Sequence, residues 1–143
     1  MDLQSRSVSF SSKTEDWETP QWLFDELHAE FGFETDLAAS AENAKCRQFY
    51  TKADDALTKE WSGVCWCNPP YGRQIADWVK KAAESQATVV FLLPVRTDTK
   101  WFHEWVLPYA NIWFLKKRIK FVGAKHNAPF PTMICVFDRR ENT

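Results

Sequence analysis

The sequence lacks three features that would each point to a class of protein. No apolar stretch approaches the length of about 20 residues that a membrane-spanning helix needs, so we expect no membrane partner. No charge of one sign dominates, because the formal net charge is −1, so nucleic-acid binding would depend on a local basic patch. Glycine is scarce, at four of 143 residues, so a cofactor site is not recognisable here from a glycine-rich loop.

Cysteine is present in four copies, but not at the spacing of a metal or redox motif. Cys65 and Cys67 are two positions apart and share one face of a predicted strand, whereas zinc knuckles and redox pairs have two residues between the cysteines. Cys46 and Cys135 are far away in the sequence. We therefore predict buried, reduced thiols in a cytoplasmic protein, and no metal site.

Length and composition indicate one folded domain. Hydrophobic residues make up 45% of the chain, which excludes a disordered protein, and 143 residues are enough for one hydrophobic core. The Ser-rich residues 1–15 are predicted to be a flexible N-terminal tail, and residues 16–143 to be the domain.

The first predicted element is a helix that starts near residue 20. Thr19 is expected at the N-cap and Pro20 at the first helical position, where its missing N–H is tolerated. An apolar stripe follows at four-residue steps, and Gly32 ends the helix.

The rest of the chain alternates between strand and helix patterns, which favours an α/β fold with a mostly parallel sheet. Residues 41–62 are expected to be loop and short helix, and residues 118–123 are a possible further strand. The predicted strands are 33–40, 64–67, 88–94, 111–115 and 132–138, and the predicted later helices are 73–84 and 99–107.

Three of these strands are followed by polar or tight loops, "DLAAS", "NPPYG" and "PVRTDT". In parallel sheets, ligands bind beyond the carboxyl ends of the strands. The three loops are therefore the predicted edge of an active site.

The loop "NPPY" has a specific chemical use. Each proline fixes its own φ angle and restricts the residue before it, so Asn68-Pro69-Pro70 is predicted to be extended and stiff. The Asn68 side-chain oxygen and the Pro69 carbonyl then form two fixed acceptors that suit an amino group with two hydrogens. Tyr71 offers a ring on which a flat base would stack. Such a site would catalyse by positioning. A plain tight turn or a polyproline ligand is the structural alternative.

Beyond this loop, the chain resembles the small phage-type DNA N6-adenine methyltransferases, the phage Dam-like family. The matching blocks stand in the family's order over residues 16–138: "DWETPQWLFDEL", "FETDLAAS", "CNPPYG", "LLPVRTDTKWF", "KKRIKF" and "FPTMICVF". The resemblance implies a minimal Rossmann-like class I fold that uses S-adenosylmethionine. It implies methyl transfer to adenine N6 in double-stranded DNA, with the target base flipped out of the helix.

The resemblance also implies roles for individual residues. Asn68 and the Pro69 carbonyl would hold the amine, Pro70 would set the geometry, and Tyr71 would stack on the adenine. The predicted cofactor-binding residues are Trp17, Thr19, Pro20, Asp36, Ala38, Ala39 and Asp55, with Asp54 an equal alternative to Asp55.

The chain departs from broader methyltransferases in two ways. "DLAAS" stands where a glycine-rich F-x-G-x-G turn is usual, as in the phage-type family. There is also no room for a separate target-recognition domain, so DNA contacts must come from loops.

The basic block "KKRIKF" is the main candidate for these contacts, because its cations would bind phosphate in a salt-dependent way. A solvated strand edge protected by lysine is the alternative. Asp98 has a second interpretation as a helix cap, and Phe130 as a packed loop anchor. The predicted DNA-binding residues are Arg96, Thr97, Asp98, Lys116, Lys117, Arg118, Lys120, Phe121 and Phe130.

Two other functions stay open at this level. The "NPPY" loop alone would equally serve a methyltransferase acting on cytosine N4, RNA or a protein amide, and a basic patch would persist in a non-catalytic DNA-binding relic. The sequence does not decide between a monomer and a homodimer. Action on DNA implies the cytoplasm, which is the host cytoplasm if a phage encodes the protein.

Overall fold

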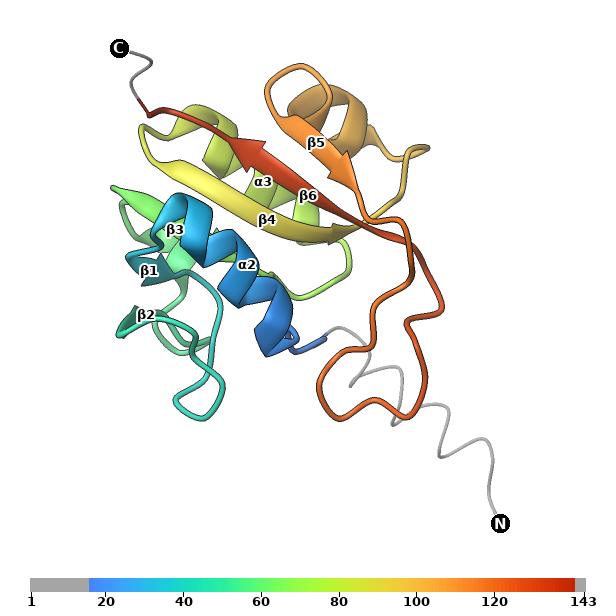
Figure 1. Cartoon of the computed structure of the whole chain (residues 1–143). Helices are drawn as coiled ribbons and strands as arrows, with labels where there is room; N and C mark the ends of the chain where they lie inside the picture. Colours follow the sequence, from blue (N-terminus) through green and yellow to red (C-terminus); the bar gives the residue numbers. More distant parts are fainter. Residues whose placement is uncertain (1–15, 141–143) are drawn as a thin grey trace.

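The computed structural model describes residues 16–140, so the predicted flexible tail, residues 1–15, lies outside the described residues. The described residues form one six-stranded sheet with helices on both of its faces (Figure 1). The strands are β1 (Thr35–Asp36), β2 (Gln48–Phe49), β3 (Val64–Cys67), β4 (Thr88–Pro94), β5 (Asn111–Phe114) and β6 (Thr132–Phe137). The helical elements are α2 (Gln21–Phe31), the 3₁₀ turn η1 (Ala56–Thr58), α3 (Ile75–Glu84) and η2 (Phe102–Val106).

The sheet is mixed, which corrects the expectation of a mostly parallel sheet. Its strand order is β2-β1-β3-β4-β6-β5. The pairs β1–β2, β1–β3 and β3–β4 are parallel, whereas β4–β6 and β5–β6 are antiparallel. Both antiparallel pairs involve β6, so β6 is the strand that runs against the other five. The α/β class itself is confirmed.

The centre of the sheet forms the core. Every residue of β4 and β6 is buried, as the continuous apolar run at 88–94 predicts for a strand covered on both faces. Helix α3 packs beside η2 on one side of the sheet, and α2 lies on the other (Figure 1). The apolar face of α3 is buried at i, i+3, i+4 and i+7, through Ile75, Trp78, Val79 and Ala82.

Helix α2 begins one residue later than predicted. Pro20 occupies the N-cap position with an extended backbone, φ −61° and ψ 138°, and within residues 16–140 no side chain caps the helix. Thr19 is therefore not the N-cap, and its buried hydroxyl contacts Asn68 instead. The predicted end is correct, because Gly32 adopts the left-handed conformation with φ 65° and donates its N–H to His28.

Three other elements differ from the sequence prediction. Residues 41–62 were expected to be loop and short helix, and η1 is that short helix. The same region also contains strand β2, which was not predicted. Strand β2 has only two residues, so it shows no alternation of apolar and polar residues that the sequence could reveal. Residues 118–123 are not a strand, and the Val122 N–H pairs with the Glu18 carbonyl outside the sheet at 3.0 Å. The helix predicted at 99–107 is mainly the π-helical η2.

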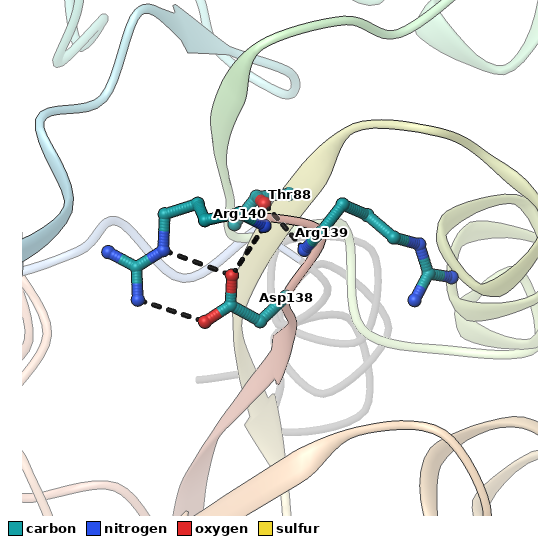
Figure 2. Close-up of polar contacts among 4 residues, drawn as sticks. All are labelled: Thr88, Asp138, Arg139 and Arg140. Atoms are coloured by element: carbon teal, nitrogen blue, oxygen red, sulfur yellow. Dashed lines mark hydrogen bonds and ion pairs between the residues drawn. The ribbon is translucent and has the colours of Figure 1, made fainter. Parts of the chain in front are cut away.

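The end of β6 is fixed to its neighbours by a small polar cluster (Figure 2). The Arg140 guanidinium donates to both carboxylate oxygens of Asp138, at 3.0 and 2.9 Å. The Arg139 backbone N–H donates to Thr88 Oγ1 at 2.8 Å, and its side chain donates to the Ala83 carbonyl near the end of α3 at 2.7 Å. These contacts hold β6 in register against β4, far from the predicted active-site edge.

Two further predictions concern the cysteines and membrane-spanning helices. Cys65, Cys67 and Cys135 are buried as expected, and Cys46 is half-buried. Within residues 16–140, no helix is long and apolar enough to cross a membrane.

Candidate active site

The predicted loops meet at one edge of the sheet. Asp36 and Cys67 end the parallel strands β1 and β3, and Pro94 ends β4 beside them. Strand β6 starts at the same edge, because Thr132 pairs with Pro94. Residues 115–131 connect β5 to β6 and are here called the basic segment. They consequently lie at this edge of the sheet, next to the start of α2 (Figure 1).

Asn68 is the residue with the most defined geometry at this edge. Its side-chain nitrogen donates to the Trp17 carbonyl and, at 3.0 Å, to Thr19 Oγ1. Because a backbone carbonyl only accepts hydrogen bonds, the nitrogen must be the atom that faces Trp17. The side-chain oxygen, Oδ1, is buried and finds no hydrogen-bond partner among the described residues. A buried acceptor without a donor is costly, which makes this oxygen a candidate ligand-binding atom.

Tyr71 is buried, with 3% of its surface exposed. Its hydroxyl donates to the Leu92 carbonyl at 2.9 Å, and burial holds the pKa of its phenol well above the usual range. The rings of Phe121 and Phe130 pack edge-on against it, with centroids 6.3 and 5.8 Å away. The predicted stacking ring is therefore covered in this structure by the basic segment.

A pocket of about 850 Å³ opens beside Asn68. It takes in the segment before α2, the loop after β1, η1 and the start of the loop after β3. Six of the seven predicted cofactor residues line it, the exception being Pro20, and three of the four predicted catalytic residues line it, the exception being Tyr71. The predicted residues in its wall are Trp17, Thr19, Asp36, Ala38, Ala39, Asp55, Asn68, Pro69 and Pro70.

Asp36 is the buried acid of this pocket. Its two carboxylate oxygens accept from the backbone N–H groups of Ala38, at 3.3 Å, and Lys45, at 3.0 Å. Burial raises the pKa of Asp36 to about 6, against the smaller lowering effect of these hydrogen bonds. The carboxylate therefore helps to shape the loop after β1.

The structure separates Asp54 from Asp55. The Asp54 carboxylate accepts from the Thr51 N–H at 2.8 Å and from the Thr51 hydroxyl at 3.0 Å, which holds it in a local turn. Asp55 has a left-handed backbone, φ 56°, an uncommon conformation for a residue other than glycine, and it lines the pocket. Of the two, Asp55 is the acid that faces the pocket.

Several pocket residues were missed by the sequence analysis. Trp78 lies on the buried face of α3, and it also lines the pocket and stacks on Trp61 with ring centroids 5.9 Å apart. Its indole N–H is buried without an acceptor within residues 16–140. Polar residues of the 41–62 region carried no motif that would have singled them out. The missed lining residues include Asn43, Lys45, Thr51, Lys52, Trp66, Gln74 and Trp78.

The basic segment presents its cations to solvent. Lys116, Lys117, Arg118 and Lys120 are exposed, and residues 115–131 contain no Asp or Glu. The predicted contact Phe121 differs, because it is buried against Trp17 with centroids 5.2 Å apart. The cluster is thus a polarised surface on a chain with nearly balanced charge.

Phe130 is half-buried and packs edge-on against Trp17, with ring centroids 5.2 Å apart. This contact agrees with the alternative interpretation of Phe130 as a residue that anchors the loop by packing. The same ring lies next to Tyr71, so the anchor is also a neighbour of the predicted base site.

The helix that follows β4 is capped by a different residue from Asp98, which the sequence suggested. Thr99 Oγ1 donates to the Arg96 carbonyl at 2.7 Å and accepts from the Phe102 N–H at 3.3 Å, so Thr99 rather than Asp98 caps the helix. Thr97 and Asp98 are exposed and Arg96 is half-buried, and all three follow the carboxyl end of β4.

The pocket brings acidic, aromatic and small side chains together in one cavity. Carboxylates of Asp36 and Asp55, the aromatic side chains of Trp17 and Trp78, and the small residues of the loop after β1 line one cavity. Its volume lies in the range of about 300–1,000 Å³ typical of small-molecule sites. Asn68 and Trp78, which both line this pocket, each carry a buried polar atom without a partner among the described residues.

The sequence of this chain is similar to a family of known proteins. The model of the family described as DNA N-6-adenine-methyltransferase (Dam) matches residues 6–138. The DNA N-6-adenine-methyltransferase of Haemophilus phage HP1 is 32% identical over 128 residues, which cover 85% of this chain and 74% of the phage protein. The DNA N-6-adenine-methyltransferase of Escherichia phage T1 is 36% identical over 94 residues, covering 62% of this chain and 39% of that protein. The putative methyltransferase YfdM of Escherichia coli is 40% identical over 63 residues, covering 38% of this chain and 69% of its own length.

Proposed function

This chain belongs to the family of DNA N-6-adenine methyltransferases (Dam), and we propose how its residues transfer a methyl group to the N6 amino group of adenine in DNA. The observation that carries the mechanism is the buried Asn68 Oδ1, which has no partner among the described residues. It is an acceptor fixed in place before the substrate arrives, as preorganised catalysis requires.

The fold is proposed to be a Rossmann-like class I methyltransferase fold. The strand order β2-β1-β3-β4-β6-β5, with β6 alone reversed, supports this assignment. Five strands that run in one direction collect their carboxyl ends at one edge, and the candidate pocket opens at that edge.

Asn68 and Pro69 are proposed to hold the target amine. Asn68 Oδ1 and the Pro69 carbonyl would each accept one N6 hydrogen, which draws the nitrogen lone pair out of conjugation and directs it at the methyl carbon. The nitrogen would then bond to the methyl carbon of a bound donor, whose own bond to that carbon would break, and the methylated amine would lose one proton to water. The contribution of the protein is positioning, and Pro69 and Pro70 keep the two acceptors from moving.

The methyl donor is proposed to be S-adenosylmethionine, which supplies an electrophilic methyl group on a sulfonium when bound. Asp36 would meet cationic charge, and the small side chains of Ala38 and Ala39 would allow close approach to the backbone. Asp55 would face the adenosine, and Trp17 would border the opposite part of the pocket. The raised pKa of Asp36 supports this fit, because a cation beside the carboxylate would keep it ionised.

The flipped adenine is proposed to lie between Tyr71 and Phe130. A base between two parallel rings needs them about 7 Å apart, twice the van der Waals separation of about 3.5 Å. The rings are now in edge contact at 5.8 Å, so Phe130 has to move to admit the base. The same movement would give the amine access to Asn68 Oδ1, which is buried in the DNA-free structure.

Double-stranded DNA is proposed to bind along the edge that contains the basic segment and the loop after β4. Lys116, Lys117, Arg118 and Lys120 are exposed and would contact phosphates, while Arg96 lies closer to the sheet edge. Because the substrate is DNA, we propose the cytoplasm as the place of action, which is the host cytoplasm if a phage encodes the protein.

The proposal is tested by exposing unmethylated DNA to the purified protein and S-adenosylmethionine, then mapping modified bases by sequencing. N6-methyladenine at reproducible positions is the expected result. Modified cytosine alone, or no modification while the protein binds DNA, would instead support one of the alternatives left open by the sequence.

A further inference from the structure

The Asn68 carboxamide is oriented by two residues of the segment before α2, Trp17 and Thr19. An Asn side chain has two N–H donors, and here one is given to the Trp17 carbonyl and the other to Thr19 Oγ1. With both donors engaged, the position of Oδ1 is determined. The segment 17–19 therefore sets where the amine acceptor points, although it is about 50 residues away in the sequence.

Orientation matters because the terminal torsion of Asn is broad and roughly two-fold. A half-turn about that torsion would exchange the oxygen for the NH₂ group. The site would then present a donor to the amine hydrogens and repel them. Of the two contacts that prevent the half-turn, the Trp17 carbonyl belongs to the backbone, so Thr19 provides the contact that depends on side-chain identity.

Thr19 is well placed to act as such a support. Only 3% of its surface is exposed, so its hydroxyl interacts with Asn68 away from bulk water. Its position is fixed from two directions: the Pro20 carbonyl next to it accepts from the Leu23 N–H at 3.2 Å, and the Glu18 carbonyl accepts from Val122 of the basic segment at 3.0 Å.

We propose that Thr19 is a positioning residue for methyl transfer, which fixes the Asn68 carboxamide so that Oδ1 faces the target amine. This inference rests on the proposed function, since it assigns Asn68 Oδ1 to the amine. It goes beyond the cofactor contact expected for Thr19 from the sequence. Thr19 does line the cofactor pocket, so its two roles have to be separated by experiment.

The matched variants are Thr19→Val, which keeps the branched shape but loses the acceptor, and Thr19→Ser, which keeps the hydroxyl. In single-turnover reactions at saturating cofactor and DNA, we expect Thr19→Val to be about 10- to 100-fold slower, the scale of a misplaced catalytic group. Thr19→Ser should stay within about threefold of wild type. Calorimetry with S-adenosylhomocysteine should give Kd values within about threefold for all three proteins.

The inference would be overturned if Thr19→Val lost cofactor affinity instead of single-turnover rate. If Thr19→Val loses affinity for S-adenosylhomocysteine by the full factor while its saturated single-turnover rate equals wild type, then Thr19 is a cofactor contact only. Equal losses in the Ser and Val variants would likewise show that the hydroxyl does not matter.

A second measurement needs neither activity nor the Val variant. In wild-type protein without cofactor or DNA, the side-chain NH₂ protons of Asn68, assigned by their loss in Asn68→Asp, should give two separate NMR signals with slow hydrogen exchange. Thr19→Ser should preserve both signals. Fast exchange of both protons in wild type would contradict the inference even if the enzyme is active, whereas wild-type inactivity on DNA with protected protons would contradict the proposed function alone.

Discussion

The rings of Tyr71 and Phe130 touch edge-on, with centroids 5.8 Å apart and planes inclined by 66°. Tyr71 belongs to the loop after β3, whereas Phe130 belongs to the basic segment that carries the exposed lysines. A base can stack on Tyr71 only if this contact opens. In the proposed mechanism the basic segment binds phosphate and Phe130 moves to admit the base, so one stretch of chain takes part in both steps.

Two substitutions of Tyr71 distinguish the contribution of its hydroxyl to stability from that of its ring. Tyr71→Phe removes the hydrogen bond to the Leu92 carbonyl, so the free energy of unfolding should fall by about 1 kcal/mol. Tyr71→Ala leaves a cavity and should cost about 3–5 kcal/mol. Urea unfolding measures both values.

The same two variants test stacking. Tyr71→Phe keeps the ring and should methylate DNA at close to the wild-type rate under conditions where both proteins are folded. Tyr71→Ala should be much slower. Similar residual activities in the two variants would argue that Tyr71 supports the fold but does not hold the base.

Asp36 should make stability depend on pH. Its pKa is raised from 3.8 to about 6 in the folded protein, so the folded state binds more protons than the unfolded chain between these values. The contribution of Asp36 to stability is therefore present at low pH and is lost as the pH rises through about 6. A shift of about two pKa units corresponds to about 3 kcal/mol.

The measurement is the difference in unfolding free energy between wild type and Asp36→Asn at several pH values. The variant loses one acceptor for the Ala38 or Lys45 N–H at every pH, which shifts all values equally. The wild-type advantage should shrink as the pH rises from 4 to 6.5. An advantage that stays constant or grows over this range would show that Asp36 is not the buried acid described above.

Much of this fold was predictable from local pattern. The strands β3, β4 and β6 and the helix α3 follow from apolar runs and helical periodicity, which record burial directly. The role of Thr19 was not predictable in the same way. A Thr-Pro pair reads as a helix start, and only tertiary structure shows that the hydroxyl contacts Asn68.

The candidate site divides along the same line. Asn68, Pro69 and Asp36 were identified because a rigid loop and a strand end are visible in sequence. Trp78 was not singled out, since helical spacing does not reveal that a buried indole also borders a pocket. The burial of Tyr71 depends on the basic segment, whose path has no regular secondary structure to predict.

The basic segment should account for the salt dependence of DNA binding. Changing Lys117 and Lys120 together to Ala should weaken binding and reduce the slope of log K against log salt by up to about one unit per lost phosphate contact. The matched control changes Lys80 and Lys81 of α3 to Ala, which removes the same charge on a different element. Fluorescence anisotropy over a salt series gives both slopes. A slope that falls equally in the control, or does not fall at all, would exclude the segment from the interface.

Asn68 carries the central claim, and one measurement addresses it most directly. Wild type, Asn68→Ala and the control Asn111→Ala, on the exposed edge strand β5, are incubated with methyl-labelled S-adenosylmethionine and unmethylated DNA, and the DNA is digested to nucleosides. The account predicts label in N6-methyladenine with wild type and Asn111→Ala, and none with Asn68→Ala, while Asn68→Ala still binds S-adenosylhomocysteine. Near-normal labelling by Asn68→Ala, or label from wild type in cytosine alone, would contradict it.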